Sequence, residues 1–229
     1  CSGIFDTAPA RGKTTTTRTM RTKTLILTAA IGLAGAASSM AQVYSVNAVG
    51  YINLSFVPGF TMMANQLDNG ADNLVSDLFT GAPEGTTVYK FKSDTGTYDI
   101  NILEFGEWSN PAMTLVPGEG AFVRNTTADP FNVTLVGEVP QGTLTTPVPA
   151  TFAILSSQVP QAGQLDTVLG FPVDEGDTVY RWAAAAQTYV TSIYEFGEWS
   201  VPPELEVGQA FFSKAATAKD WTREFSVND

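Results

Sequence analysis

The stretch GTTVYKFKSDTGTYDINILEFGEW (residues 85–108) recurs without a gap as GDTVYRWAAAAQTYVTSIYEFGEW (residues 176–199), 91 positions further along the chain. Twelve of the 24 positions are identical. The similarity continues on both sides, where residues 60–63 match 152–155 and residues 115–125 match 205–215 after a one-residue gap. Such self-similarity at a fixed period indicates a duplicated structural unit, here about 90 residues long.

Within each copy the local patterns are those of β-structure. Apolar and polar residues alternate in four segments: Thr87–Phe91, Thr178–Trp182, Phe131–Val136 and Trp221–Val227. One short helix per copy is predicted, over residues 72–79 with Asp72 as its N-cap and over residues 165–169. Many short strands at close spacing predict an all-β fold of two tandem small β-sandwich or barrel units, each with one short helix.

The two repeats are separated by a connection rich in Pro, Gly and Thr, GEVPQGTLTTPVPA (residues 137–150). We therefore place the first β-repeat at residues 42–140 and the second at residues 141–229.

The beginning of the chain has the pattern of a signal peptide, predicted over residues 20–41. Charged Met20–Lys23 precedes an apolar run, and Ser39-Met40-Ala41 supplies the small residues of a cleavage site after Ala41. The run of about fourteen residues is shorter than a membrane-spanning helix, so no transmembrane segment is expected in the mature form. Residues 1–19 are interpreted as an upstream extension from a mis-assigned start codon. The expected location is secreted or on the outer cell surface.

The chain is acidic, with twelve basic and 23 acidic residues and a formal charge of −11. Without residues 1–41, seven basic and 22 acidic residues remain, a charge of −15 over 188 residues. This charge repels nucleic-acid phosphates and anionic lipid, so nucleic acid is not an expected partner.

The residue types needed for conventional catalysis are missing from the sequence. It has no histidine, and its one cysteine, Cys1, precedes the predicted cleavage site. Ser-His-Asp and Cys-His arrangements and imidazole metal sites are therefore excluded. Carboxylate-only mechanisms are left open, and we expect a protein that is not an enzyme and has no cofactor other than a candidate calcium ion.

The order of motifs in the first copy resembles an uncharacterised family of secreted verrucomicrobial proteins that occurs as many paralogues. The motifs are VYSVNAVGYINL (43–54), PGFTMMANQL (58–67), VYKF (88–91), LVPGEGAFVRN (115–125) and TLVGEVPQG (134–142). Both copies are also similar to the GWNLISLP…PGKGYWV β-repeats of bacterial surface and extracellular proteins. The resemblance implies an extracellular β-protein and assigns no catalytic residue. The second copy departs from it, because residues 205–210 lack the Pro and the second Gly of the turn.

The repeated EFGEW (104–108 and 195–199) is the first candidate site. In a regular strand the carboxylates of Glu104 and Glu107 point to opposite faces, and they meet only if Gly106 forms a bulge. Paired carboxylates and a tryptophan fit a sugar site or a carboxylate glycosidase. The alternative is that each tryptophan fills a core position and the glycine permits a bend. The candidate ligand-binding residues here are Trp108, Trp199, Glu104, Glu107, Glu195 and Glu198.

Two further candidate sites follow from local patterns. Asp68, Asn69 and Asp72 alternate oxygen ligands around a glycine, which fits either a calcium site or an Asx-rich turn. Tyr98 and Tyr189 occupy equivalent positions in the two copies and fit either a carbohydrate platform or the core.

Three functions are left open by these patterns. The favoured hypothesis is a structural protein of the cell surface or matrix that associates with itself as a homo-oligomer or polymer, aided by pairing of the Val43–Leu54 strand with a second unit. The alternative is an extracellular carbohydrate-binding module whose partner is a glycan. A carboxylate glycosidase is the third.

Overall fold

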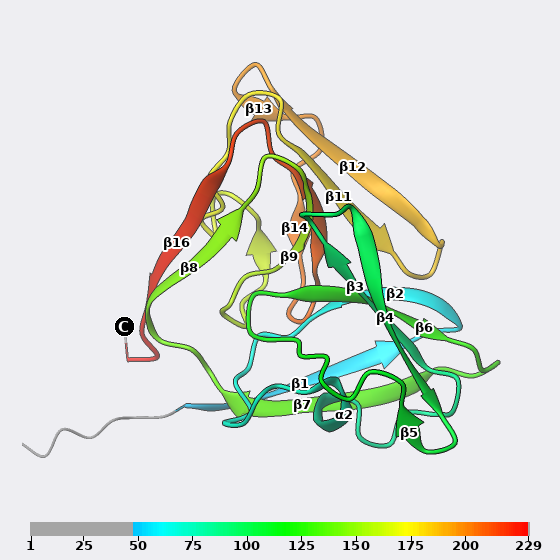
Figure 1. Ribbon diagram of the computed structural model, residues 1–229. Coiled ribbons are helices and arrows are strands. Elements are labelled where there is room, and N and C mark those ends of the chain that lie inside the picture. The colour runs from blue at the N-terminus through cyan, green and yellow to red at the C-terminus, as the bar shows by residue number, and fades with distance from the viewer. Residues whose placement is uncertain (1–47, 229) are drawn as a thin grey trace, which may run out of the picture. The chain divides into compact units, whose positions relative to one another are not determined.

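The structure is a computed structural model that describes residues 48–228, all within one compact unit of the chain, residues 47–229 (Figure 1). The predicted upstream extension, the signal peptide and residues 43–47 of the opening strand lie outside the described residues. Within residues 48–228, no helix has the length and apolar character needed to cross a membrane.

The fold is all-β, as predicted from the sequence. The first copy contains β1 (Val49–Phe56), β2 (Gly59–Ala64), α2 (Val75–Leu78), β3 (Thr87–Lys92), β4 (Thr97–Glu104), β5 (Glu107–Trp108), β6 (Gly120–Asn125) and β7 (Phe131–Glu138). The second contains β8 (Gly142–Val148), β9 (Phe152–Leu155), β10 (Gly163–Gln164), β11 (Thr178–Ala183), β12 (Thr188–Glu195), β13 (Glu198–Trp199), β14 (Glu204–Leu205), β15 (Phe211–Lys214) and β16 (Lys219–Phe225).

The two copies share the topology of their two main sheets, and the second copy has in addition the short pair of β10 with β14. Each has an antiparallel five-stranded sheet, in the order β2-β6-β3-β4-β5 in the first copy and β9-β15-β11-β12-β13 in the second. In each copy the first and last strands form a separate pair, β1 with β7 and β8 with β16. The sheets stay open, so the sandwich alternative describes both copies. β1 pairs with β7 along its whole length, from Val49 opposite Glu138 to Phe56 opposite Phe131, so this strand is engaged within its own copy.

Each copy has its own hydrophobic core between its five-stranded sheet and the pair of its first and last strands. In the first copy Phe56 of β1 and Leu135 of β7 pack with Val88 of β3. In the second copy Trp221 of β16 packs with Val179 of β11 and Phe211 of β15. These side chains are almost wholly buried, and such burial is the main favourable contribution to folding.

A third apolar cluster joins the copies through the opposite faces of the five-stranded sheets. Met62 and Phe122 of the first copy pack there with Ile154 and Phe212, their equivalents in the second. Because successive side chains of a strand alternate between faces, Met63 lies in the first core while Met62 lies in this shared cluster. Each five-stranded sheet is thus buried on both faces near its centre.

The helix predictions were only partly right. In the first copy the helix covers Val75–Leu78, and its N-cap is Leu74 without a side-chain hydrogen bond, so Asp72 does not cap it. In the second copy residues 165–169 form a hydrogen-bonded turn. The amide of Gly170, at φ 71°, donates to the carbonyl of Asp166 and ends that turn, and Pro172 follows. Glycine and proline at these positions prevent a longer helix.

Gly120 of the first copy packs directly against Ala210 of the second, which is its equivalent position. A Cβ added to Gly120 would lie 2.4 Å from the Cβ of Ala210 and 2.6 Å from Cγ2 of Ile154. The interface therefore has room for a methyl group at one of the two positions. This explains why the second copy has an alanine where the first copy has the second glycine of its turn.

Gly120→Ala is expected to lower the free energy of unfolding by about 1–3 kcal/mol, because it overpacks the contact between the copies. Adding Ala210→Gly moves the methyl group from one copy to the other and is expected to recover part of this loss. Urea denaturation of the single and double variants measures both effects. If Gly120→Ala unfolds at the wild-type urea midpoint, the contact accommodates a second methyl group and is not overpacked.

Candidate functional site

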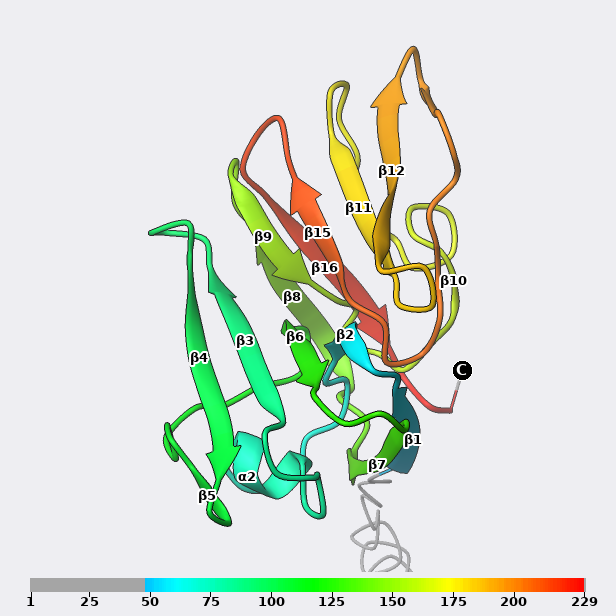
Figure 2. The same cartoon turned by 90° about the vertical axis from the view of Figure 1, so that its right-hand side faces the viewer.

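Aromatic side chains of both copies line a cleft next to the shared cluster. Figure 2 shows β3 and β4 of the first copy on one side of this region and β11 and β12 of the second copy on the other. The cleft contains two pockets, and each is lined by residues of both copies.

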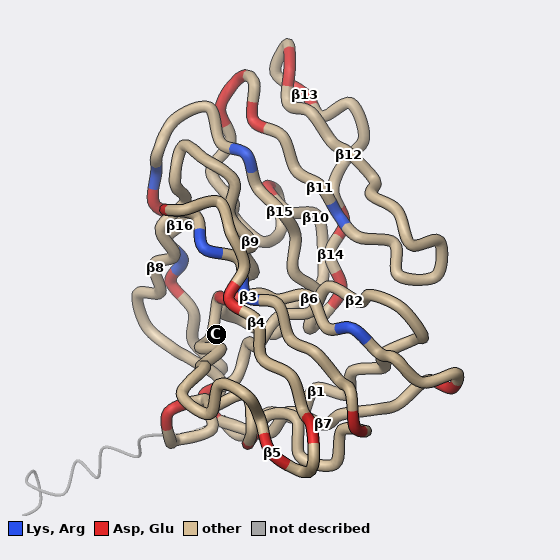
Figure 3. The backbone as a smooth tube through the Cα atoms, turned by 45° about the vertical axis from the view of Figure 1, so that its right-hand side comes forward, with Lys and Arg blue, Asp and Glu red and all other residues tan. Residues whose placement is uncertain are grey.

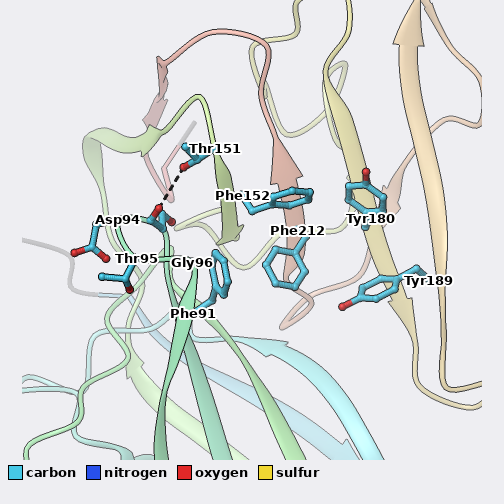
Figure 4. A pocket seen from close by; sticks show the side chains of 10 residues that line it. Phe91, Asp94, Thr95, Gly96, Thr151, Phe152, Tyr180, Tyr189 and Phe212 are labelled. Atoms are coloured by element: carbon cyan, nitrogen blue, oxygen red, sulfur yellow. Dashed lines mark hydrogen bonds between the residues drawn. The ribbon is translucent and has the colours of Figure 1, made fainter.

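The first pocket has a volume of about 700 Å³ (Figure 4). Its rings come mainly from the second copy, with Phe91 added from β3 of the first. Phe91 and Phe212 meet edge to face with 5.1 Å between ring centroids. Its polar side comes from the β3–β4 turn and from Thr151, whose hydroxyl donates to the carbonyl of Ser93 at 3.4 Å. Its ring-bearing residues are Phe91, Phe152, Tyr180, Tyr189 and Phe212.

The second pocket has a volume of about 400 Å³ and is lined by Phe60, Tyr89, Tyr98, Phe122, Trp182 and Tyr189. It is the counterpart of the first, because the duplication makes Phe60 equivalent to Phe152, Tyr89 to Tyr180 and Phe122 to Phe212. Trp182 takes the place that Phe91 has in the first pocket. The duplication has therefore produced two related aromatic pockets, with Tyr189 in both.

Hydrogen bonds between the copies fix the walls of the second pocket. The indole Nε1 of Trp182 donates to the carbonyl of Phe60 at 2.8 Å. Gln187 donates to the same carbonyl at 2.8 Å and accepts from the amide of Phe60 at 2.8 Å. Trp182 also meets Phe122 edge to face with 5.4 Å between centroids. The pocket is held in place by these contacts.

Tyr98 and Tyr189 lie at the surface of the cleft, with 38% and 41% of their area exposed. Burial, and next the negative charge of a deprotonated Tyr189, raise the pKa of Tyr98 to about 12. Burial also raises the pKa of Tyr189. Both phenols are therefore neutral hydrogen-bonding groups at physiological pH. Of the sequence-predicted residues, these two are the ones that line the aromatic pockets.

One exposed cation lies over a ring of each pocket. The guanidinium of Arg124 is 5.8 Å from the centroid of Phe60, and the ammonium of Lys214 is 5.7 Å from the centroid of Phe152. Arg124 and Lys214 are equivalent residues of the two copies. The attraction between a cation and a ring face contributes about 0.5–1 kcal/mol at exposed sites. The second pocket thus has a positive charge at its edge and no charged residue in its lining.

The repeated EFGEW forms a tight β-hairpin and not one continuous strand, and its glycine lies in the turn. Phe105 and Gly106 are the two turn residues between β4 and β5, with φ 56° and 78°. Phe196 and Gly197 repeat this turn between β12 and β13, with φ 58° and 81°. Positive φ at both central residues is the geometry of the two-residue hairpins that match strand twist. The turn could not be recognised from the sequence, because its first position holds phenylalanine where asparagine, aspartate or glycine is usual.

A glutamate that lies outside the hairpin accepts hydrogen bonds from the backbone amides of each turn. The amide of Gly106 donates to Glu84 Oε1 at 2.7 Å. In the second copy the amides of Phe196 and Gly197 donate to the two carboxylate oxygens of Glu175, each at 2.8 Å. Glu84 and Glu175 are equivalent residues. Both turns are therefore fixed in the same conformation.

The turns expose their phenylalanine rings almost completely, 98% for Phe105 and 96% for Phe196. Glu104 lies directly opposite Glu107 across the hairpin, and Glu195 lies opposite Glu198. Figure 3 shows acidic residues, in red, around β5 and β13. The carboxylates of each pair share one face of the hairpin, and they line neither aromatic pocket. We call each turn with its flanking glutamates a phenylalanine hairpin.

The two tryptophans of EFGEW lie against the cores. Trp199 is 7% exposed and belongs to the core of the second copy, where it meets Tyr194 with 5.2 Å between centroids. Trp108 is partly buried and packs on the first core, 6.1 Å from Phe79. These positions favour the packing interpretation over a ligand platform.

The oxygen ligands of the candidate calcium loop are engaged by the loop itself. Asp68 Oδ1 accepts from the amide of Gly70 at 3.0 Å, and Asn69 Oδ1 accepts from the amide of Ala71 at 3.0 Å. Such bonds are those of Asx turns. Asp72 is exposed beside them. Among the residues that the structure describes, no group of three or more His, Cys, Asp or Glu is placed to hold a metal ion.

Sequence reasoning left the paired rings open between a carbohydrate platform and the core, and it missed the cleft because the cleft lies between the two copies. The overlooked signal was the run Gly120-Ala121-Phe122-Val123, whose continuous apolar character is typical of a strand buried on both faces.

Comparison of the chain with protein-family models, with curated proteins and with solved structures found no match.

The raised pKa of Tyr98 predicts a loss of stability in strong alkali. Because the folded pKa of about 12 exceeds the ordinary value of 10.0, the contribution of the neutral phenol is present below pH 10 and lost as pH rises from about 10 to about 12. Ultraviolet titration is expected to show a late-ionising phenol that Tyr98→Phe removes. Tyr189→Phe should shift it to lower pH, because it removes a negative charge. A titration curve that Tyr98→Phe leaves unchanged would contradict this assignment.

Proposed function

We propose that this chain is a non-enzymatic structural protein of the cell surface or extracellular matrix that associates with itself through its phenylalanine hairpins. The observation that carries the proposal is the presence of a fully exposed ring on a fixed turn in both copies. The resemblance to secreted verrucomicrobial proteins and the predicted signal peptide support the extracellular setting.

The hairpin tip combines three features that do not favour the isolated fold. A bulky side chain at positive φ is strained. An exposed ring forgoes the burial that stabilises a phenylalanine by about 1.5–3 kcal/mol. Like charges directly opposite each other in a sheet are destabilising by up to about 1 kcal/mol. Both copies keep all three features although half of the aligned positions in residues 85–108 have changed, so a role outside folding stability accounts for them best.

A ring on a fixed turn is well suited to an interface. It adds a large apolar area, and the turn has already lost the conformational freedom that binding would otherwise remove. Aromatic side chains are also enriched among the residues that dominate interface energies. The charge of −15 over residues 42–229 opposes unspecific contact between copies, so association needs a specific anchor of this kind.

Carbohydrate binding is a second candidate, favoured by the composition of the first pocket. The lining there combines aromatic rings with four polar residues, Ser93, Asp94, Thr95 and Thr151. Rings that stack on sugar faces, together with a few polar groups that fix orientation, are what a sugar site needs.

Replacement of both exposed rings tests self-association. Phe105→Ser with Phe196→Ser is expected to shift the chain to monomers in sedimentation velocity at concentrations where the wild type forms larger species, because both anchors are lost. Thermal stability should stay within about 0.5 kcal/mol, as for other exposed positions. Tyr51→Ser is the control, because Tyr51 is an exposed aromatic residue on β1. A wild-type chain that stays monomeric at all concentrations would refute the proposal.

Replacement of a ring in the first pocket tests the second candidate. Tyr180→Ala is expected to abolish retention on any polysaccharide that the wild type binds in a glycan array, because it removes a stacking surface. Tyr51→Ala is the matched control outside the cleft. Wild-type chain that binds no glycan, or binds one equally well after Tyr180→Ala, would rule out carbohydrate binding at this pocket.

A further inference from the structure

We infer that the second aromatic pocket receives a phenylalanine hairpin of another copy of this chain. The inference rests on the proposed self-association and names the surface that accepts the exposed ring. Three observations carry it: the distance between hairpin and pocket within one chain, the lining of the pocket, and the charges of the two surfaces.

A hairpin cannot reach the pocket of its own chain. Tyr98, in the pocket, and Phe105, at the tip, are seven residues apart on the extended strand β4, which spans about 23 Å at 3.3 Å per residue. Tyr189 and Phe196 are separated in the same way along β12. In Figure 1, β5 and β13 lie at opposite ends of the described unit. The occupant must therefore come from a second molecule.

The second pocket matches the hairpin better than the first pocket does. Its lining consists of six aromatic residues, which suits a phenylalanine ring, and its wall is fixed by the Trp182 to Phe60 hydrogen bond. The lining of the first pocket includes Asp94, which adds a negative charge near the glutamates of an entering hairpin. Repulsion between like charges at an interface disfavours that arrangement.

The charges of the two surfaces are complementary. Each hairpin carries two exposed glutamates beside its ring, and the exposed Arg124 lies over Phe60 at the edge of the second pocket. A ring that enters the pocket brings these carboxylates toward the guanidinium. Arginine suits this role, because its planar group can bind a carboxylate through two parallel hydrogen bonds.

The pairing joins two different surfaces, so it is heterologous and builds either a closed ring or an open filament. Each molecule offers two hairpins and one accepting pocket. The number of links therefore cannot exceed the number of molecules. Linear or branched assemblies and closed rings are expected, and a densely cross-linked network is not.

Charge reversal at the edge of the pocket tests the inference. Arg124→Glu is expected to weaken wild-type self-association about tenfold or more, because it sets like charges against each other in the contact. Lys214→Glu is the matched control, since it makes the same change at the equivalent position of the first pocket and should leave association within about twofold. Sedimentation velocity across a concentration series measures both, and circular dichroism shows whether each variant is folded.

A mixing experiment separates docking from any general effect of the substitution. Arg124→Glu keeps its hairpins, and the Phe105→Ser, Phe196→Ser chain keeps its pocket. Each alone should be monomeric, whereas a mixture should form small complexes of defined size. No complex in the mixture, or an Arg124→Glu chain that associates like the wild type while the hairpin variant does not, would mean that the hairpins dock elsewhere. A monomeric wild type would instead overturn the proposed function itself.

Discussion

The architecture depends on the burial of two five-stranded sheets against each other. Met62, Phe122, Ile154 and Phe212 leave water at this contact, and the backbones meet where Gly120 faces Ala210. Because each sheet already packs on its own two-stranded partner, this second burial fixes one copy relative to the other. The aromatic cleft exists only because that contact sets the two sheets side by side and leaves rings uncovered at its margin.

Duplication followed by packing accounts for where the pockets and the exposed tips lie on the surface. Residues that face the shared contact became pocket walls, with Tyr98 and Tyr189 at the rim. Residues at the far ends of the same strands became exposed tips. Both features come from one ancestral hairpin, whose near end lines the cleft and whose far end carries the phenylalanine. The proposed accepting pocket and each proposed donor ring are thus separated by the length of β4 or β12.

The strands and the two copies could be predicted because alternation and repetition are local properties of the sequence. The second helix was predicted wrongly, because residues 165–169 form only a hydrogen-bonded turn that ends at Gly170, with Pro172 after it. The phenylalanine hairpin was missed because Phe105 occupies a position that usually holds asparagine or glycine. The pockets depend on contacts between residues more than 100 positions apart, such as Trp182 with Phe60, and no local pattern reports them. The equivalence of Tyr98 and Tyr189 was visible, but their shared cleft was not.

The pairing of Gly120 with Ala210 has a bearing on how the halves of different molecules can combine. Two second copies brought together would set methyl against methyl in a space that takes one, and two first copies would leave that space unfilled. Unlike halves therefore pack best. If molecules exchanged halves, a first copy would therefore still pack best against a second copy. The methyl group of Ala210 makes the two surfaces sterically complementary.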